Sequence, residues 1–473
     1  MKNRLLAVIA CLCVSQAVAD DKAGIIEIID SRFDRHQDIA MQIFDYAELG
    51  YLEEKSSALL QKTLSDAGFA IETGVADIPT AFVASAGSGK PVIAFLAEFD
   101  ALPGITQTTD PFRNEIPGKA GGHACGHHLF GTASVGAAIA VKEWLAQSGT
   151  KGTVRLYGTP AEEGGSGKVY MVREGLFKDV DAVLVWHPSD RNRAVANTSL
   201  ANRSAKFRFR GVSAHAAGAP HKARSALDGV EAFNHMVNLL REHVPQETRI
   251  HYVITAGGHA PNVVPDFAEV FYYVRHPDAR TLVNIWQRVE AAAEGAAQGT
   301  GTQVDWEIIH GNHSKLPNET LGNVMQANLE TVGGVQYSKE EKQYAEELYK
   351  TLTLPDLAIG SEREIQAMRT DNQKGSTDVG DISWNVPTVS LQAATWVPGT
   401  SSHSWQAIAA GGTTIGIKGV QVAAKTLSLT AMDLYEDDGL LKTARQEFLA
   451  RRGKDFKYEP LLGDRDPPLD YRK

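Results

Sequence analysis

The segment Pro91-Val92-Ile93-Ala94-Phe95-Leu96-Ala97 is a continuous apolar run, and Glu98-Phe99-Asp100 follows it directly. An unbroken apolar run of this kind predicts a strand that is buried on both faces. Further strand-like runs occupy residues 152–159 and 181–186, and helical patterns occupy residues 129–146 and 167–174. This alternation predicts an α/β fold in which a mostly parallel sheet carries helices on both faces.

Residues 202–316 follow a different order, βαββαβ, which is the split βαβ or ferredoxin-like unit. After this unit the first pattern resumes, with a strand expected at residues 388–391. The sequence therefore predicts that residues 20–201 and 317–473 form one domain and that residues 202–316 are inserted into it. The last residues, 463–473, are rich in proline and charge and are expected to be a loose tail.

The composition favours an enzyme that acts on small molecules. Of the 473 residues, 43% are hydrophobic and 22% are charged, which is typical of a soluble globular protein. The net charge of -10, without a run of Lys and Arg, argues against nucleic acid or an anionic membrane as a partner. After the N-terminal segment, no run approaches the roughly 18 apolar residues of a spanning helix. We therefore expect no integral membrane segment.

The N-terminus has the features of a secretory signal. Lys2 and Arg4 precede an apolar stretch that ends at Ala17-Val18-Ala19, a small-residue cleavage pattern. Residues 1–19 are therefore predicted to be a signal peptide, and the mature protein is expected to be periplasmic or secreted. A lipoprotein-type cleavage at Cys11 is the less favoured alternative, because the apolar run before it is short. Loss of this segment would leave Cys125 as the only cysteine.

Polar side chains follow each predicted strand at the point where the strand ends. Asp100 follows the first strand, Glu162 and Glu163 follow the second, and His187 follows the third. Because the carboxyl ends of parallel strands meet at one edge of a sheet, a ligand site is expected there.

The segment Gly121-Gly122-His123-Ala124-Cys125-Gly126-His127-His128 sets one thiol among three imidazoles, and each such group needs a polar partner when it is buried. A dinuclear hydrolytic site needs about five or six donors, a free carboxylate and an open position. Glu162 is the candidate base. The candidate ligands are Cys125, His127, Glu163, His187 and His403. Thiolate and imidazole donors favour zinc, and manganese or cobalt is also possible.

Other interpretations are open for the same residues. Taken singly, a histidine such as His187 is a structural side chain, two adjacent glutamates form a solvated turn, and Cys125 is a small apolar residue. Cys125 as a nucleophile with His127 as its base is a second enzymatic hypothesis. A non-catalytic periplasmic binder of amino-acid conjugates is a third. The joint placement of these residues at predicted strand ends favours the metal site.

Eight motifs, in this order, resemble the aminoacylase and glutamate-carboxypeptidase family of dinuclear metal amidohydrolases. Within it, the chain is similar to the branch with plant indole-acetyl-amino-acid hydrolases and bacterial p-aminobenzoyl-glutamate hydrolases. The motifs begin at Ala97 (AEFDALP), His123 (HACGH), Ala161 (AEEGGSGK), Trp186 (WHP), Ala214 (AHAA), Pro261 (PNVV), Ser376 (STDVGD) and His403 (HSWQ). One departure is His128, where many members of this branch have Asp.

The resemblance implies a metallopeptidase-like catalytic domain with two divalent metal ions per subunit and a smaller lid domain that also forms a homodimer. It implies the five ligands named above, Glu162 as general acid and base, and Asp100 as a carboxylate behind the ligands. His215 would reach the partner subunit's site and polarise the scissile carbonyl. Asn262 would contact substrate, and Arg275 is a candidate for binding its carboxylate. The implied reaction cleaves the amide bond of N-acyl or N-aroyl amino-acid conjugates, p-aminobenzoyl-glutamate-like ones first; a dipeptidase or a general aminoacylase is the alternative.

Overall fold

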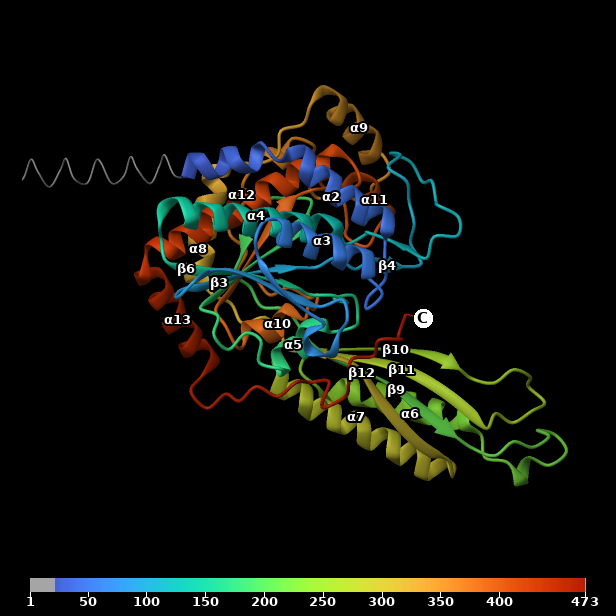
Figure 1. Ribbon diagram of the computed structural model, residues 1–473. Coiled ribbons are helices and arrows are strands. Elements are labelled where there is room, and N and C mark those ends of the chain that lie inside the picture. Colours follow the sequence, from blue (N-terminus) through green and yellow to red (C-terminus); the bar gives the residue numbers. More distant parts are fainter. Residues whose placement is uncertain (1–21, 473) are drawn as a thin grey trace, which may run out of the picture.

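The computed structural model describes residues 22–472 (Figure 1). The predicted signal peptide, residues 1–19, and the alternative cleavage at Cys11 lie outside these residues, so export stays a prediction. Cys125 is a free, buried cysteine.

A seven-stranded sheet forms the centre of the larger part of the molecule, with the strand order β1-β2-β6-β3-β7-β13-β8. The four middle strands of this order run parallel to one another, and the three outer strands run antiparallel to their neighbours. The bounds are β1 Ala70–Thr73, β2 Phe82–Ser88, β6 Gly152–Gly158, β3 Val92–Ala97, β7 Ala182–Ser189, β13 Thr388–Ala394 and β8 Arg193–Val195. The predicted parallel strands are confirmed. The outer strands were not predicted, because they are short or mix polar and apolar residues.

Helices cover the sheet, with α2, α3, α4 and α12 above it and α5 and α10 below it in Figure 1. Their bounds are α2 Phe33–Tyr46, α3 Glu54–Asp66, α4 His127–Ser148, α5 Gly167–Arg173, α8 Glu319–Val332, α9 Lys339–Tyr349, α10 Val379–Ser383, α11 Trp405–Gly411, α12 Thr414–Glu436 and α13 Asp438–Arg452; residues 22–30 are also helical. Among the described residues, α4 alone is long and apolar enough to cross a bilayer, and 83% of its most apolar window is buried inside the protein. Its apolar character therefore fits its place against the sheet and α12.

A separate four-stranded antiparallel sheet has the order β10-β11-β9-β12 and its own hydrophobic core, which includes Phe207, Phe209 and Trp286. In chain order its elements are β9 Ala201–Arg210, α6 Ala226–Leu240, β10 Arg249–Ala256, β11 Phe267–His276, α7 Ala279–Thr300 and β12 Gln303–Asn312. The predicted βαββαβ order is confirmed. Its role as a lid and the exact domain boundaries stay predictions.

The C-terminal segment is not a loose tail, and the prediction for residues 463–473 was wrong for the part that the structure describes. After α13 the chain passes along the smaller sheet and returns to the larger domain (Figure 1). Arg465 pairs with Glu307 of the smaller sheet at 3.1 Å, and Leu469 and Tyr471 pack against the main core. These contacts join residues far apart in the chain, so the local composition of the segment did not indicate them.

Candidate metal centre

Cys125 and His127, two of the predicted metal ligands, lie in the turn at the start of α4. Gly126 lies between them with φ +77°, and a Cβ atom there would come within 2.7 Å of the Pro188 side chain. Only glycine therefore allows this turn to approach the end of β7 so closely. The approach brings Cys125 next to His187, the residue that β7 supplies.

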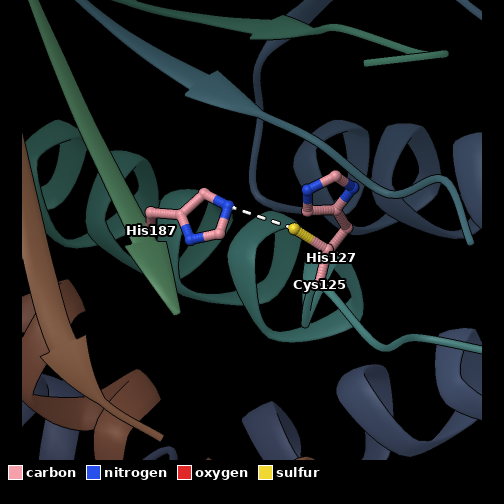
Figure 2. A group of neighbouring side chains, drawn as sticks. All are labelled: Cys125, His127 and His187. Atoms are coloured by element: carbon pink, nitrogen blue, oxygen red, sulfur yellow. Dashed lines mark hydrogen bonds between the residues drawn. The ribbon is translucent and has the colours of Figure 1, made fainter. Parts of the chain in front are cut away.

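His187 is oriented by its own strand end. Its Nδ1 lies 2.7 Å from the Pro188 carbonyl oxygen and donates to it, so that Nε2 faces Cys125 Sγ at 3.4 Å (Figure 2). A zinc ion bound by both atoms with tetrahedral angles would hold them about 3.5 Å apart. The observed separation fits a shared cation.

Asp100 connects His127 to the glutamate turn. His127 Nδ1 donates to Asp100 Oδ1 at 2.9 Å, and the Glu163 backbone N–H donates to Oδ2 at 2.9 Å. Burial opposes the charge on Asp100, but the His127 imidazole and these hydrogen bonds lower the pKa of its carboxyl group below the usual value. A carboxylate behind a ligand histidine fixes the tautomer that leaves Nε2 free.

Three buried atoms at the site make no hydrogen bond to any described residue: His127 Nε2, Glu98 Oε2 and Glu163 Oε1. His127 Nε2 and Glu98 Oε2 lie 3.1 Å apart, and Glu163 Oε1 lies 3.4 Å from His403 Nε2. Each contact places an imidazole nitrogen beside a carboxylate oxygen without forming a hydrogen bond, and a buried polar atom that lacks a hydrogen bond is costly. Their clustering with a thiol and two further imidazoles fits residues that hold metal ions.

Three overlapping groups of side chains each place their donor atoms within 4.8 Å of one another. The groups are Cys125, His127 and His187; Cys125, Glu163 and His403; and His127, Glu162 and Glu163. His403 has φ +60°, a left-handed conformation that is uncommon for a side chain of this size. Such strain persists where the surroundings fix it and is concentrated at functional sites. All five predicted ligands are thus brought to one place.

Four of these ligands, Cys125, Glu163, His187 and His403, line a cavity with a volume of about 1030 Å³, and Glu162 lines it too. Burial, and then the charges of Glu163 and Glu98, raise the pKa of Glu162 well above the usual value. Burial and the Glu163 charge likewise raise the pKa of the Cys125 thiol. A thiolate at Cys125 therefore needs a cation beside it, which favours a ligand over a free nucleophile.

A buried ion network behind the site was missed in the sequence. Lys168 Nζ lies 2.8 Å from Glu98 Oε1 and 2.7 Å from Asp378 Oδ1, and all three side chains are nearly or fully inaccessible. The Lys168 backbone N–H also donates to Asp378 Oδ2. Glu98 stands at a strand end and Asp378 in a motif, but no local pattern joins either of them to Lys168.

The other predicted residues are distributed over three environments. Arg275 lines the cavity. His215 and Asn262 do not line it: they are exposed and lie on neighbouring loops at the outer end of the smaller sheet. His123 and His128 are buried and contact the backbone carbonyl groups of Ile43 and Gly411, so they are structural side chains.

Comparisons with known proteins agree with this arrangement. The model of Peptidase family M20/M25/M40 matches residues 94–407. Over 449 residues the chain is 43% identical to one of the p-aminobenzoyl-glutamate hydrolase subunits of Escherichia coli (strain K12), a match that covers 89% of this chain and 93% of that protein. It is 28% identical to the Xaa-Arg dipeptidase of Mus musculus, over 89% of this chain and 90% of that protein. A solved dinuclear metal-binding peptidase of family M20 from Bacillus subtilis shares the fold, with a TM-score of 0.58 at 19% identity over 86% of this chain and 99% of that chain.

Proposed function

Because the chain belongs to Peptidase family M20/M25/M40, we propose that it is a metal-dependent amidohydrolase that cleaves N-acyl or N-aroyl amino-acid conjugates. p-Aminobenzoyl-glutamate is the first candidate substrate, since the relative with 43% identity is part of a p-aminobenzoyl-glutamate hydrolase. One observation carries the proposal: four candidate ligands and Glu162 line one cavity, the fifth candidate, His127, lies beside them, and buried atoms of His127 and Glu163 are left without hydrogen bonds to the described residues.

Two divalent metal ions would be held by the two donor groups that share Cys125, one with His127 and His187 and the other with Glu163 and His403. When bound, such ions lower the pKa of a water molecule and polarise a carbonyl oxygen. Glu162 then takes the proton of the attacking water and returns it to the leaving nitrogen. Zinc suits the thiolate and imidazole donors best, with manganese or cobalt as alternatives.

Arg275 and Lys315 are the proposed binding groups for the substrate carboxylate. Both line the cavity, and the buried Arg275 Nε makes no hydrogen bond to a described residue. Lys315 donates to Asn197 Oδ1 at 2.8 Å, and burial, then the Arg369 charge, lower its pKa to about 8. An anionic ligand would form charge-assisted hydrogen bonds with both cations, because neither has a described carboxylate partner within 4 Å.

A homodimer through the smaller domain is the proposed assembly. Strand β10 is an edge of the smaller sheet and exposes Tyr252, Val253 and Ile254. Exposed apolar residues on a sheet edge favour a protein contact. His215 and Asn262 are exposed on neighbouring loops at the outer end of the smaller sheet. In the proposed dimer, these loops of one copy would reach the cavity of the other.

A substrate screen with two metals tests the proposal. The zinc- and manganese-loaded proteins are incubated in parallel with p-aminobenzoyl-glutamate, indole-acetyl-aspartate, N-acetyl amino acids and dipeptides, and the products are measured by mass spectrometry. We expect hydrolysis of an aroyl or acyl conjugate that disappears on exhaustive chelation and returns when metal is added. Activity that survives chelation but is lost to a thiol reagent would favour the Cys125 nucleophile instead.

A dipeptidase is the second candidate function, because the chain is similar over 89% of its length to an Xaa-Arg dipeptidase. The dipeptides in the same screen distinguish it from the conjugate hydrolase. If neither the wild type nor Glu162→Gln turned over any compound of the panel above background, only the non-catalytic binder would be left.

A further inference from the structure

The turn that carries Glu162 and Glu163 is held by its backbone. Ala161, the first residue of the turn, has φ +57°, a conformation that costs a residue other than glycine on the order of 1 kcal/mol. Its N–H donates to Glu53 Oε1 at 2.8 Å. At the other end, Tyr51 Oη donates to the Gly165 carbonyl oxygen at 2.6 Å. Since Asp100 accepts the Glu163 N–H, side chains from elsewhere in the fold fix this strained turn at three points.

The C-terminal segment supplies the fourth point. The carbonyl oxygen of Glu163 accepts hydrogen bonds from Tyr471 Oη at 3.1 Å and from Arg472 Nη2 at 2.7 Å. Both donors are more than 300 residues away from Glu163 in the sequence. Two donors on one carbonyl oxygen restrict rotation of the peptide plane that follows Glu163, and so restrict the direction of its side chain.

The fold provides a defined place for these last residues. A Cβ atom on Gly50 would lie 2.3 Å from Tyr471 Oη, so this glycine leaves room for the phenol. The Tyr471 ring packs edge-on against Tyr51, with 5.5 Å between the ring centroids. Upstream, Tyr458 Oη donates to Asp381 Oδ1 at 2.8 Å, and Arg465 pairs with Glu307 of β12 at 3.1 Å. The segment is therefore anchored along its length before it reaches the turn.

We propose that Tyr471 and Arg472 are positioning residues for the carboxylates of Glu162 and Glu163. They act through the Glu163 carbonyl group, and they hold the turn in the conformation in which Glu163 faces His403 and Glu162 faces the cavity. This inference rests on the proposed function for its effect on catalysis. Its effect on metal binding does not depend on the identity of the substrate.

The test compares the full-length wild type with the double variant Tyr471→Phe/Arg472→Met, which keeps the ring and most of the side-chain volume but removes both hydrogen-bond donors. Asp470→Asn is the matched control, since Asp470 is an exposed neighbour in the same segment. The dissociation constant for Zn²⁺ is measured by competition with a fluorescent chelator. We expect about tenfold weaker binding in the double variant and no change in the control, as is typical when a group that supports a ligand is removed. The variant Tyr471→Phe/Arg472→Lys, in which the lysine can still donate to the carbonyl oxygen, should recover most of the zinc affinity that the double variant loses.

Kinetics on the best substrate give the second measurement. A positioning role predicts a lower kcat with KM within twofold of the wild type. A rise in KM alone would overturn the inference, because Arg472 would then bind substrate. Zinc affinity and kcat within twofold of the wild type would also overturn it and leave the segment a packing element. If the double variant fails to fold, Arg472→Met alone removes the shorter of the two hydrogen bonds and keeps the Tyr471 ring in place, and the same outcomes apply to it. Should the wild type hydrolyse nothing in the panel, weaker zinc binding in the variant would still support the positioning role while the proposed function fails.

Discussion

The turn at residues 161–165 and the loop that carries His215 present two opposite ways to hold a functional side chain. The turn lies at the buried edge of the seven-stranded sheet, and side chains from distant parts of the chain fix its backbone. His215 is exposed, and among the described residues its Nδ1 accepts only from the N–H groups of Ala217 and Gly218 in its own loop. All five candidate metal ligands thus come from one chain, whereas His215 is held by its own loop alone, and its proposed place of action is the cavity of a second copy of the chain.

The largest expected effect is at the turn, where two adjacent carboxylates have different proposed roles. Glu162→Gln should lower kcat about 1,000-fold, because the proton acceptor is lost. Its zinc affinity should stay within a few-fold of the wild type, whereas Glu163→Gln should bind zinc more weakly. Turnover assays and chelator competition on both variants measure this difference. Equal zinc affinities for the two variants would contradict the division of roles.

The buried ion network of Lys168, Glu98 and Asp378 should contribute to the stability of the folded protein. Lys168→Met leaves Glu98 and Asp378 buried without their cation and should lower the free energy of unfolding by about 4 kcal/mol, as is typical of a broken buried pair. Urea unfolding at neutral pH, in the metal-free protein, measures the loss. Lys90→Met removes an exposed lysine that pairs with Asp181 and is the matched control. A loss below about 1 kcal/mol would show that the network does not stabilise this region.

The loop that carries His215 should affect catalysis without affecting stability. His215→Ala should leave unfolding unchanged but lower kcat about 100-fold, the typical cost of a lost donor to a developing oxyanion. Co-refolding it with Glu162→Gln should restore about a quarter of wild-type activity, because half of the random dimers are mixed and each has one intact site. If the mixture is no more active than its parts, His215 does not act across a dimer.

The smallest expected effect is at Arg275, which lies on the smaller sheet but lines the cavity of its own chain. Arg275→Gln should raise KM about tenfold for a conjugate with a free carboxylate, with little change in kcat, because one charge-assisted contact is lost. The same conjugate with its carboxylate amidated is the control, and its KM should not respond. Equal effects on both ligands would contradict a carboxylate contact.

Much of the candidate site could be predicted because its signals are local. Glu163 and His187 stand at the ends of buried apolar runs, and parallel strands bring such ends to one edge. The Cys125 and His127 pair was recognisable from its density of donors. Glu162 was a candidate base from its place beside Glu163, and His403 completed the donor count; the family resemblance supported both roles.

Other contacts had no signal of this kind. Lys168 looked like the end of a glycine-rich turn, yet its ammonium group lies between Glu98 and Asp378. The position of Arg472 against Glu163 could not be inferred from a segment rich in proline and charge. Both contacts join residues that are far apart in the chain, and neither follows the periodicity of a helix or strand.

The sequence by itself determined the parallel strands, the inserted βαββαβ unit and the chemical type of each metal donor, because periodicity and residue chemistry act over short stretches. The tertiary structure alone decided which atoms remain without partners, which cation neutralises the buried carboxylates and where the chain end lies. These features depend on long-range packing, in which a buried polar group takes its partner from whichever segment the fold brings beside it.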